Sequence, residues 1–448
     1  MSESTAITDE LLASDPFTGY SYSYPHKTAY RQLDRPVSLG EVWCDEEQNS
    51  LFLYFHIPFC EFRCGFCNLF TLSQPARDLT KRYLGAVRQQ AAAIRSELPN
   101  ARYARVAIGG GTPTYLPPKD LGEVFSIFRD ELNVDSMRIP VSCEASPATT
   151  DNETLAALRD NGVDRLSLGI QSFDEGDSQA MGRPQNRSQV EASLNRIRQF
   201  GFRTLNLDLI YGSEGQSQQS WLSSVEQAIQ LQPEELYLYP LYVRQFTGLG
   251  RRSSSKAGCQ PNDCRLKAYQ LARDRLLAQG YVQSSLRMFH RAGVSVDAEP
   301  TYCCQRDGMI GLGAGARSYT TQLHYSGRYA VQQSAIQNII EDYVSQSDED
   351  WRTVSYGIWL DAEDQRRRNI ILSLLQANGL SLPDYYQQFG SLPSDDIPQL
   401  QALVDLEWAK YDGDWLKLTP IGIERSDAIG PWLYSDRVRR RMNEYEWT

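Results

Sequence analysis

The stretch Leu51-Phe-Leu-Tyr-Phe-His-Ile-Pro-Phe-Cys-Glu-Phe-Arg-Cys-Gly-Phe-Cys67 joins a short apolar run to three closely spaced cysteines. The run has the length and composition of a buried β-strand. Cys60, Cys64 and Cys67 follow it with the spacing C-x3-C-x2-C. Three thiolates on one loop can bind three irons of a cubane and leave the fourth iron without a protein ligand. The stretch therefore predicts an iron–sulfur site with one open coordination position at the end of a strand.

A structural zinc site is the alternative for these cysteines. Such a site needs a fourth ligand, which Cys143, Cys259 or His56 could supply. The cysteines lie at a strand end within a series of strand–helix units, whereas zinc ribbons carry their ligands in pairs. This context favours the iron–sulfur site.

Outward from this stretch, six β-rich runs are each followed by a longer helical pattern. The strands are expected at residues 51–57, 103–108, 138–143, 165–170, 204–210 and 236–241. The helices are expected at residues 79–98, 119–132, 151–161, 187–200, 218–231 and 265–279. Six such units in succession predict an α/β fold whose parallel sheet carries helices on the outside. In an open or closed barrel of this kind, reactive groups lie on loops at the carboxyl ends of the strands.

Two segments flank these units, so three parts are expected: residues 1–50 as an N-terminal extension or lid, 51–345 as the barrel domain and 346–448 as a C-terminal domain. In the first part, His26 and Lys27 follow a tyrosine-rich run and could reach a substrate carboxylate; a solvated arm is the alternative. The last part should contain two or three helices and a small hairpin, a winged-helix-like pattern. Because the chain is acidic, a packing or lid role is favoured over DNA binding.

The composition limits which partners the protein can have. Its 448 residues are 41% hydrophobic and 23% charged, which is typical of a folded globular protein. Lys and Arg number 45 and Asp and Glu 56, so the net charge of −11 disfavours nucleic acid and anionic membranes as partners. The acidic N-terminus differs from a signal peptide, and no apolar run could span a bilayer. Nine unevenly spaced cysteines argue against a disulfide framework, so a cytoplasmic location is expected.

Glycines follow the second expected strand, at Gly109, Gly110 and Gly111, and Thr112 comes next. Without side chains, the backbone there can approach a ligand closely and leave peptide groups free to bind it. A tight turn is the alternative.

Polar residues lie at or near the ends of the next three strands. Glu144 follows the third strand, with a surface glutamate before a turn as the alternative. The fourth strand leads into Gln171 and then Arg183. Asp208 lies within the otherwise apolar fifth strand, where burial of a lone carboxylate is costly, so a partner is expected. A structural salt bridge is the alternative role for Asp208.

Phe55-His-Ile-Pro-Phe-Cys60, together with the two cysteines that follow, resembles the radical S-adenosylmethionine (SAM) superfamily and, within it, the oxygen-independent coproporphyrinogen III oxidase-like family. The resemblance extends over nearly the whole chain. It implies a partial (β/α)6 barrel of the TIM type, a smaller, mainly helical C-terminal domain and a [4Fe–4S] cluster whose open iron binds the amino and carboxylate groups of SAM. In that family, an electron from the reduced cluster cleaves SAM to methionine and a 5′-deoxyadenosyl radical.

The resemblance also implies roles for the loop residues. Cys60, Cys64 and Cys67 are the implied cluster ligands, and Phe66 is implied to lie beside the adenine of SAM. The run from Gly109 to Thr112 matches the family's GGGTP element, which contacts the methionine part of SAM.

The remaining implied SAM contacts come from later strands. Glu144 matches a glutamate that pairs with the ammonium group of SAM, while Gln171, Arg183 and Asp208 match residues that touch its ribose and carboxylate. One SAM molecule is expected, or two as in some members. A small-molecule substrate and a flavodoxin- or ferredoxin-type electron donor are also implied.

Four positions depart from the family's pattern. Leu69 stands where true coproporphyrinogen oxidases carry a fourth cysteine. Residues 310–319 resemble the family's GLGAGAHSY segment, but Arg317 replaces its histidine. The haem-chaperone branch carries a His-Asn…Tyr-Trp motif, whereas His290 and Tyr302 are followed here by arginine and cysteine. These departures leave the substrate open.

Three functions are therefore considered. The leading hypothesis is a coproporphyrinogen III oxidase-like radical SAM enzyme. The second is a methyl or methylene transferase that uses two SAM molecules and releases S-adenosylhomocysteine. The third is a haem-binding trafficking protein. Cys259, Cys264, Cys303 and Cys304 could build an auxiliary cluster, and buried or incidental thiols are the alternative.

Overall fold

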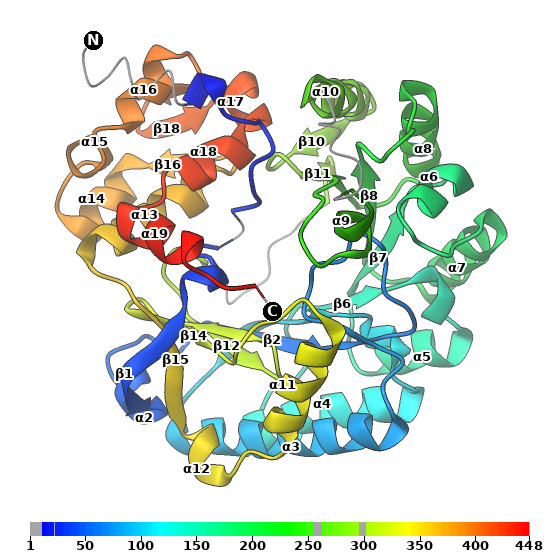
Figure 1. Ribbon diagram of the computed structural model, residues 1–448, viewed down its shortest axis with the longest axis vertical. Helices are drawn as coiled ribbons and strands as arrows, with labels where there is room; N and C mark the ends of the chain where they lie inside the picture. Colours follow the sequence, from blue (N-terminus) through cyan, green and yellow to red (C-terminus); the bar gives the residue numbers. More distant parts are fainter. Residues whose placement is uncertain (1–10, 22, 254–261, 295–301, 448) are drawn as a thin grey trace.

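Six parallel strands that follow one another along the chain lie side by side at the centre of the molecule (Figure 1). They are β2 (Leu51–Ile57), β5 (Tyr103–Gly110), β6 (Val141–Ala145), β7 (Arg165–Gln171), β8 (Thr204–Tyr211) and β9 (Glu235–Pro240). The computed structural model, which describes residues 11–21, 23–253, 262–294 and 302–447, confirms the predicted α/β class. The third strand begins at Val141 rather than at Arg138, because Pro140 has no amide hydrogen to donate to a neighbouring strand.

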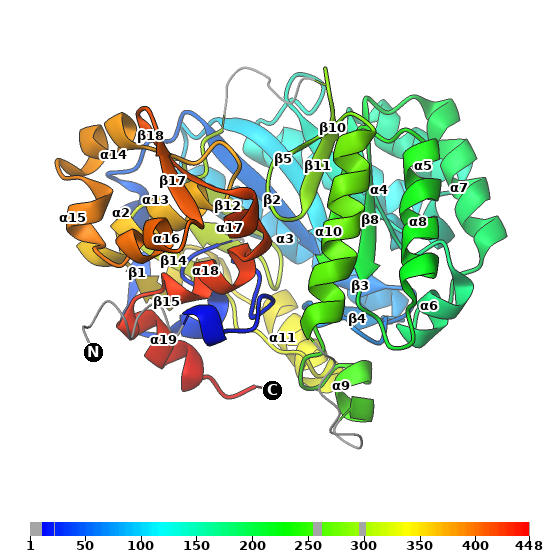
Figure 2. The same cartoon turned by 90° about the horizontal axis from the view of Figure 1, so that it is seen from above.

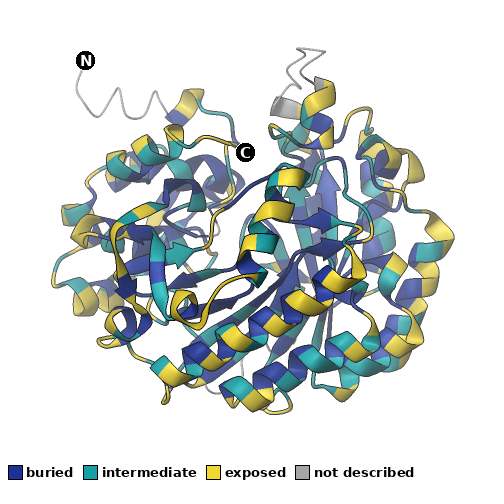
Figure 3. Cartoon of the chain, turned by 60° about the horizontal axis from the view of Figure 1, so that its bottom comes forward, coloured by how far each residue is buried: buried dark blue, intermediate teal, exposed yellow. Residues whose placement is uncertain are grey.

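A helix follows each of these strands, and together the helices cover the outer side of the sheet (Figures 1 and 2). They are α3 (Arg77–Glu97), α4 (Pro118–Leu132), α5 (Asn152–Asp160), α7 (Arg187–Phe200), α8 (Gln218–Gln230) and α10 (Asn262–Ala278). Two short helices lie between these elements, α6 (Glu175–Ala180) before α7 and α9 (Gly248–Ser253) before α10. Figure 3 shows buried residues along the sides of the helices that face the sheet, with exposed residues outside. Burial of apolar surface between these two layers stabilises the fold.

Shorter strands extend the sheet on both sides. Next to β2 lies the parallel strand β12 (Met309–Leu312), and beyond it come four antiparallel neighbours: β13 (Arg317–Tyr319), β14 (Leu323–Ser326), β15 (Thr353–Trp359) and β1 (Arg31–Ser38). Next to β9 lie β11 (Met288–Arg291) and β10 (Tyr281–Gln283). Among the described residues the strand order is β1-β15-β14-β13-β12-β2-β5-β6-β7-β8-β9-β11-β10.

Two glycines make the tight connection between β12 and β13. Gly313 and Gly315 have φ angles of +94° and +87°, which favour glycine. A Cβ atom at Gly315 would lie 2.6 Å from a ring carbon of Phe70. The turn thus brings Arg317, the first residue of β13, back toward the loop that carries the cysteines.

The C-terminal part is mainly helical, as expected, but it contains more helices than predicted. They are α13 (Ala362–Leu374), α14 (Leu382–Phe389), α15 (Pro393–Asp396), α16 (Leu400–Asp405), α17 (Pro420–Glu424), α18 (Ser426–Trp432) and α19 (Asp436–Asn443). Several are a single turn long, too short for a clear helical period in the sequence. The predicted hairpin is β17 (Ala409–Asp412) with β18 (Trp415–Leu418), and β16 (Leu380–Ser381) pairs with β18.

The remaining short elements connect these parts. They are the 3-10 helices η1 (Lys27–Ala29), η2 (Pro113–Tyr115) and η3 (Pro147–Thr149), the helices α2 (Leu39–Trp43), α11 (Gln333–Val344) and α12 (Asp348–Trp351), and the strands β3 (Phe59–Cys60) and β4 (Leu72–Ser73).

The predicted three-part division of the chain stays a prediction. Strand β1 from the first part and β15 from the last both belong to the main sheet. One hydrophobic cluster includes residues from all three parts, such as Tyr24, Phe55 and Ile371.

Candidate functional site

The three cysteines lie on a loop that leaves the carboxyl end of β2. Cys60 ends β3, and the chain returns through β4, which pairs with β3 in parallel. The N–H of Gly65 donates to the carbonyl of Met181 (3.0 Å), and the Gly65 carbonyl accepts from the N–H of Leu249 (2.7 Å). A Cβ atom at Gly65 would lie 2.7 Å from the Met181 carbonyl oxygen, so the loop requires glycine there.

All three thiols form hydrogen bonds with neighbouring side chains, and Sγ of Cys67 lies 3.8 Å from the Thr71 hydroxyl. Thr112 donates to Sγ of Cys60 (3.5 Å), and Nη1 of Arg183 donates to Sγ of Cys64 (3.2 Å). Burial raises the pKa of Cys60 to about 12; the Thr112 hydrogen bond opposes this shift, and the charges of Cys67 and Cys64 add to it. Burial also raises the pKa of Cys64, against the opposing charge of Arg183. The thiols therefore lie close enough to influence one another, and a bound metal centre would favour their thiolate forms.

The surroundings of the loop fit an iron–sulfur cluster. All three cysteines are free, and Cys64 and Cys67 are only partly buried. A Cβ atom at Gly111 would lie 2.9 Å from Sγ of Cys60, so glycine keeps space open beside that sulfur. Within the described ranges, no three His, Cys, Asp or Glu side chains are grouped closely enough to hold a single metal ion. The cysteines of a cluster, in contrast, each bind a different iron.

The glycine run and Glu144 meet beside this loop. The N–H of Gly110 donates to Oε2 of Glu144 (3.1 Å), and a Cβ atom at Gly109 would lie 2.9 Å from the same carboxyl group. Glu144 of β6 is an exposed residue, but the protein atoms around its carboxyl group desolvate that group. This desolvation, together with the nearby charge of Asp208, raises the pKa of Glu144 to about 7. A cationic ligand group there would favour the ionised form.

Asp208 has neutral hydrogen-bond partners rather than a salt bridge. Its carboxylate accepts from Nδ2 of Asn206 (2.8 Å) and from the hydroxyl of Ser167 (3.3 Å). Arg165, whose charge also reaches Asp208, forms its ion pair with Glu235 (2.6 Å). In the part of the chain that the structure describes, Asp208 belongs to no ion pair. Burial raises the pKa of Asp208, and Asn206 opposes that shift.

Arg183 connects the cysteine loop to the strand ends. Besides Cys64, its guanidinium donates to the Gly169 carbonyl, to the Ser146 hydroxyl (3.4 Å) and to Oε1 of Gln185 (3.0 Å). The sequence prediction missed Ser146 and Gln185, although Ser146 follows Glu144 closely at the same strand end.

Two more of the predicted SAM contacts, Gln171 and Phe66, come from the end of β7 and from the cysteine loop. Gln171 ends β7 with a φ angle of +71°, and its amide nitrogen would lie 2.8 Å from a Cβ atom at Gly169. Phe66 packs, partly buried, against a small apolar cluster that includes Met181 and Ile210. The implied contacts of Phe66, Gln171 and the other residues with SAM remain predictions.

The N-terminal segment packs against the cysteine loop, so the alternative of a solvated arm is wrong. Nζ of Lys27 lies 3.3 Å from the ring centroid of Tyr329, whose hydroxyl donates to the carbonyl of Asn68. Nη1 of Arg317 donates to the hydroxyl of Ser23 (2.7 Å). Burial lowers the pKa of Lys27, Arg317 lowers it further, and Cys67 opposes the shift. Two basic side chains, Lys27 and Arg317, thus lie near the loop, and the sequence prediction noted both positions without bringing them together.

The other cysteines lie apart from this loop. The thiols of Cys303 and Cys304 both donate to Oε1 of Gln305 (3.3 Å each), and Cys264 is exposed. Cys259 lies outside the described residues. The auxiliary-cluster alternative stays a prediction.

Comparison with known proteins agrees with this geometry. Residues 54–228 match the sequence model of the radical SAM superfamily. The chain is 28% identical over 400 residues to the oxygen-independent coproporphyrinogen III oxidase of Pseudomonas aeruginosa, covering 85% of this chain and 84% of that protein. It is 27% identical over 341 residues to the heme chaperone HemW of Bacillus subtilis, covering 75% of this chain and 86% of that protein.

A solved structure shares the whole fold. Coproporphyrinogen III oxidase (HemN) from Escherichia coli, a radical SAM enzyme, superposes with a TM-score of 0.79 over 93% of this chain and 97% of that chain, at 23% identity. Residues 54–228, which include the cysteine loop, form a radical SAM domain. The chain is homologous to HemN-type oxygen-independent coproporphyrinogen III oxidases and to HemW. Radical SAM proteins use a [4Fe–4S] cluster together with SAM, which confirms the predicted cofactors.

Proposed function

We propose that the protein cleaves SAM reductively at a [4Fe–4S] cluster held by Cys60, Cys64 and Cys67 and acts as a coproporphyrinogen III oxidase-like enzyme on a small-molecule substrate. The observation that carries this proposal is the loop of three free thiols at the carboxyl edge of a parallel sheet, beside glycine backbone and a carboxylate. When bound, the cluster supplies the electron that breaks a carbon–sulfur bond of SAM to give the 5′-deoxyadenosyl radical. A flavodoxin- or ferredoxin-type donor would reduce the cluster.

The residues around the loop would orient SAM. The carboxylate of Glu144 would accept hydrogen bonds from the ammonium group, a charge-assisted contact. The backbone from Gly109 to Thr112 would lie along the methionine part, because the absence of Cβ atoms at the glycines allows close approach. Gln171, Arg183 and Asp208 would contact the ribose and the carboxylate, and Phe66 the adenine.

Arg183 would have a second role, which its contacts support. Its guanidinium already donates to Sγ of Cys64 and to the carbonyl of Gly169. It would therefore hold the cysteine loop at a fixed position relative to β7, so that the cluster and SAM lie in a constant geometry.

The test is anaerobic cluster reconstitution, followed by reduction in the presence of SAM and measurement of deoxyadenosine. Cys64→Ala should lose both the cluster absorbance and deoxyadenosine formation. Cys44→Ala is the matched control, because Cys44 is exposed and directly follows α2, outside the loop, and it should keep both. Retention of both signals by Cys64→Ala, or zinc in place of iron and sulfide in the wild-type protein, would contradict the proposal.

A haem-binding trafficking role is the second candidate. It is favoured by the relative named as a heme chaperone and by Leu69, which is 47% exposed where true coproporphyrinogen oxidases carry a fourth cysteine. Incubation of the reduced holoprotein with SAM and coproporphyrinogen III separates the candidates. Decarboxylated porphyrinogen supports the oxidase-like reaction, S-adenosylhomocysteine supports a transferase, and tight haem binding without deoxyadenosine supports trafficking.

A further inference from the structure

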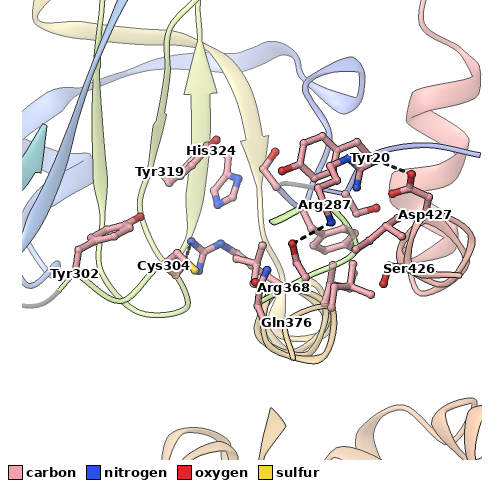
Figure 4. Close-up of a pocket in the computed structure, with 18 residues that line it drawn as sticks. Tyr20, Arg287, Tyr302, Cys304, Tyr319, His324, Arg368, Gln376, Ser426 and Asp427 are labelled. Atoms are coloured by element: carbon pink, nitrogen blue, oxygen red, sulfur yellow. Dashed lines mark hydrogen bonds and ion pairs between the residues drawn. The ribbon is translucent and has the colours of Figure 1, made fainter. Parts of the chain in front are cut away.

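A cavity of about 160 Å³ lies between the β13–β14 strands, the N-terminal segment and the C-terminal helices (Figure 4). Its walls include His324 of β14, Arg368 of α13 and Arg287, which precedes β11. The wall formed by Tyr319 and His324 lies away from the cysteine loop. Tyr319 pairs with Met309 at the amino end of β12, whereas the cysteines follow the carboxyl end of β2, which runs parallel to β12.

His324 is a buried polar side chain without hydrogen bonds. It is 0% exposed, and neither ring nitrogen has a hydrogen-bond partner. Its ring lies against Tyr319, with centroids 4.6 Å apart and planes tilted by 32°. Burial lowers its pKa well below the usual value, and the charges of Arg368 and Arg317 lower it further. The imidazole is therefore neutral and carries one N–H donor and one acceptor nitrogen.

Arg368 brings a buried positive charge into the same cavity. Its side chain is only slightly exposed, at 6%, and it donates to the carbonyls of Cys304 (2.6 Å) and Gln305 (2.9 Å). Its Nε has no hydrogen-bond partner. Figure 4 shows the guanidinium between Cys304 and His324 in the close-up. Among the described residues, Arg368 belongs to no ion pair within 4.0 Å.

The charged groups near Arg368 have other partners and do not neutralise its charge. Arg287, on the opposite wall, is paired with Asp427 (2.5 Å). Asp307, whose charge reaches Tyr302 and Cys304, accepts from the N–H of Cys303 (2.6 Å). The cavity therefore presents an excess of donors and of positive charge, while leucine and isoleucine residues of α13 form an apolar part of its lining.

We propose that this cavity binds a carboxylate-bearing organic molecule, with Nε of Arg368 and a ring N–H of His324 as donors to the carboxylate and the apolar lining around its body. A carboxylate supplies the charge and the acceptor oxygens that the two buried groups lack. The carboxylate could belong to a free small acid or to one arm of a larger substrate in the barrel. Binding here would not depend on the proposed radical chemistry.

Benzoate is a suitable probe, with benzamide as a neutral control of the same shape. The chain has four histidines, so the full-length protein labelled in its histidine rings gives few nuclear magnetic resonance signals, and His324→Phe identifies those of His324. Benzoate should shift the His324 signals and benzamide should leave them in place. Unchanged His324 signals at saturating benzoate, or equal binding of benzamide, would overturn the proposal.

Two variants test the donors by calorimetry with benzoate. Arg368→Gln and His324→Phe should each weaken binding by roughly tenfold or more, because each removes a donor to a charged group. His290→Phe on β11 is the matched control and should bind as the wild type does. If Arg368→Gln fails to fold, His324→Phe alone tests the proposal. Phenylalanine keeps the ring contact with Tyr319 and removes only nitrogens that form no hydrogen bond. Wild-type affinity in His324→Phe would overturn the proposal.

A competition measurement identifies the source of the carboxylate. If the carboxylate belongs to the substrate of the radical reaction, benzoate should inhibit product formation competitively with coproporphyrinogen III. If it belongs to a free acid, benzoate should bind and leave product formation unchanged. Absence of deoxyadenosine would contradict the proposed function alone, because benzoate binding is measured without SAM.

Discussion

Glu144 is a residue at which desolvation and a neighbouring charge act together. They raise its pKa to about 7, from 4.5 for an ordinary glutamate. Between these values the folded chain keeps a proton that the unfolded chain has released, so stability falls as the pH rises through this window. Glu144→Gln removes the ionisation. In cluster-free protein, the free energy of unfolding of Glu144→Gln should therefore exceed that of the wild type above pH 7. Below pH 4.5 this difference between variant and wild type should disappear.

Urea unfolding at pH values on either side of the window measures this difference. Glu153→Gln, an exposed position on α5, is the matched control for the same change of side chain. A stabilisation by Glu144→Gln that stays constant with pH would contradict the assigned cause.

At this scale, the sequence revealed residues that belong to local motifs. Cys60, Cys64 and Cys67 lie on one loop because only a few residues separate them, and Glu144 meets Gly110 because both are at ends of adjacent parallel strands. His324 and Arg368 carry no such signal, since they come from distant segments that meet only after folding. The sequence also did not show the neutral partners of Asp208, because one of them, Ser167, is on another strand.

The cysteine loop depends, as an element, on a glycine that touches a distant backbone carbonyl. In Gly65→Ala the new Cβ would lie 2.7 Å from the Met181 oxygen, and neither backbone can move without shifting the loop. This variant should lose about 1–3 kcal/mol of stability and bind less iron after reconstitution. Iron and sulfide per chain and urea unfolding are the measurements.

Gly85→Ala on α3 is the control, because a Cβ atom there meets nothing within 4 Å. It should gain about 0.5–1 kcal/mol, since alanine favours a helix over glycine, and keep full iron content. Full iron content in Gly65→Ala would show that the contact with Met181 is not needed.

Elements were predictable where their partners come next along the chain. The six parallel strands are apolar runs followed by helices, and each pairs with the next unit, so the sequence predicted their parallel sheet. Strand β1 was read as part of an extension, because its partner β15 lies at the far end of the chain and neither strand shows which edge it joins. Pairing between distant segments leaves no local pattern.

For the whole molecule, one buried network joins the N-terminal segment to the C-terminal helices. The hydroxyl of Tyr24 donates to Oδ1 of Asp364 (2.5 Å), which also accepts from the hydroxyl of Ser435 (2.8 Å). Asp364 is 0% exposed, so each lost hydrogen bond leaves a buried charge less well satisfied. Tyr24→Phe should therefore lower the free energy of unfolding by about 1–3 kcal/mol.

Tyr386→Phe provides the control, because Tyr386 is 56% exposed on α14 and should change stability by less than about 0.5 kcal/mol. Equal effects of the two changes in urea unfolding would mean that the network does not hold the two ends of the chain together.

During synthesis, β1 is made long before β15, the strand with which it pairs. A ribosome that has finished β1 must add roughly 300 more residues before β15 exists, which takes about 15–60 s at ordinary elongation rates. For that interval the first strand has no neighbour to pair with, and an open strand edge invites association with other chains. In a nascent chain of this protein, β1 should therefore need protection until β15 has been made.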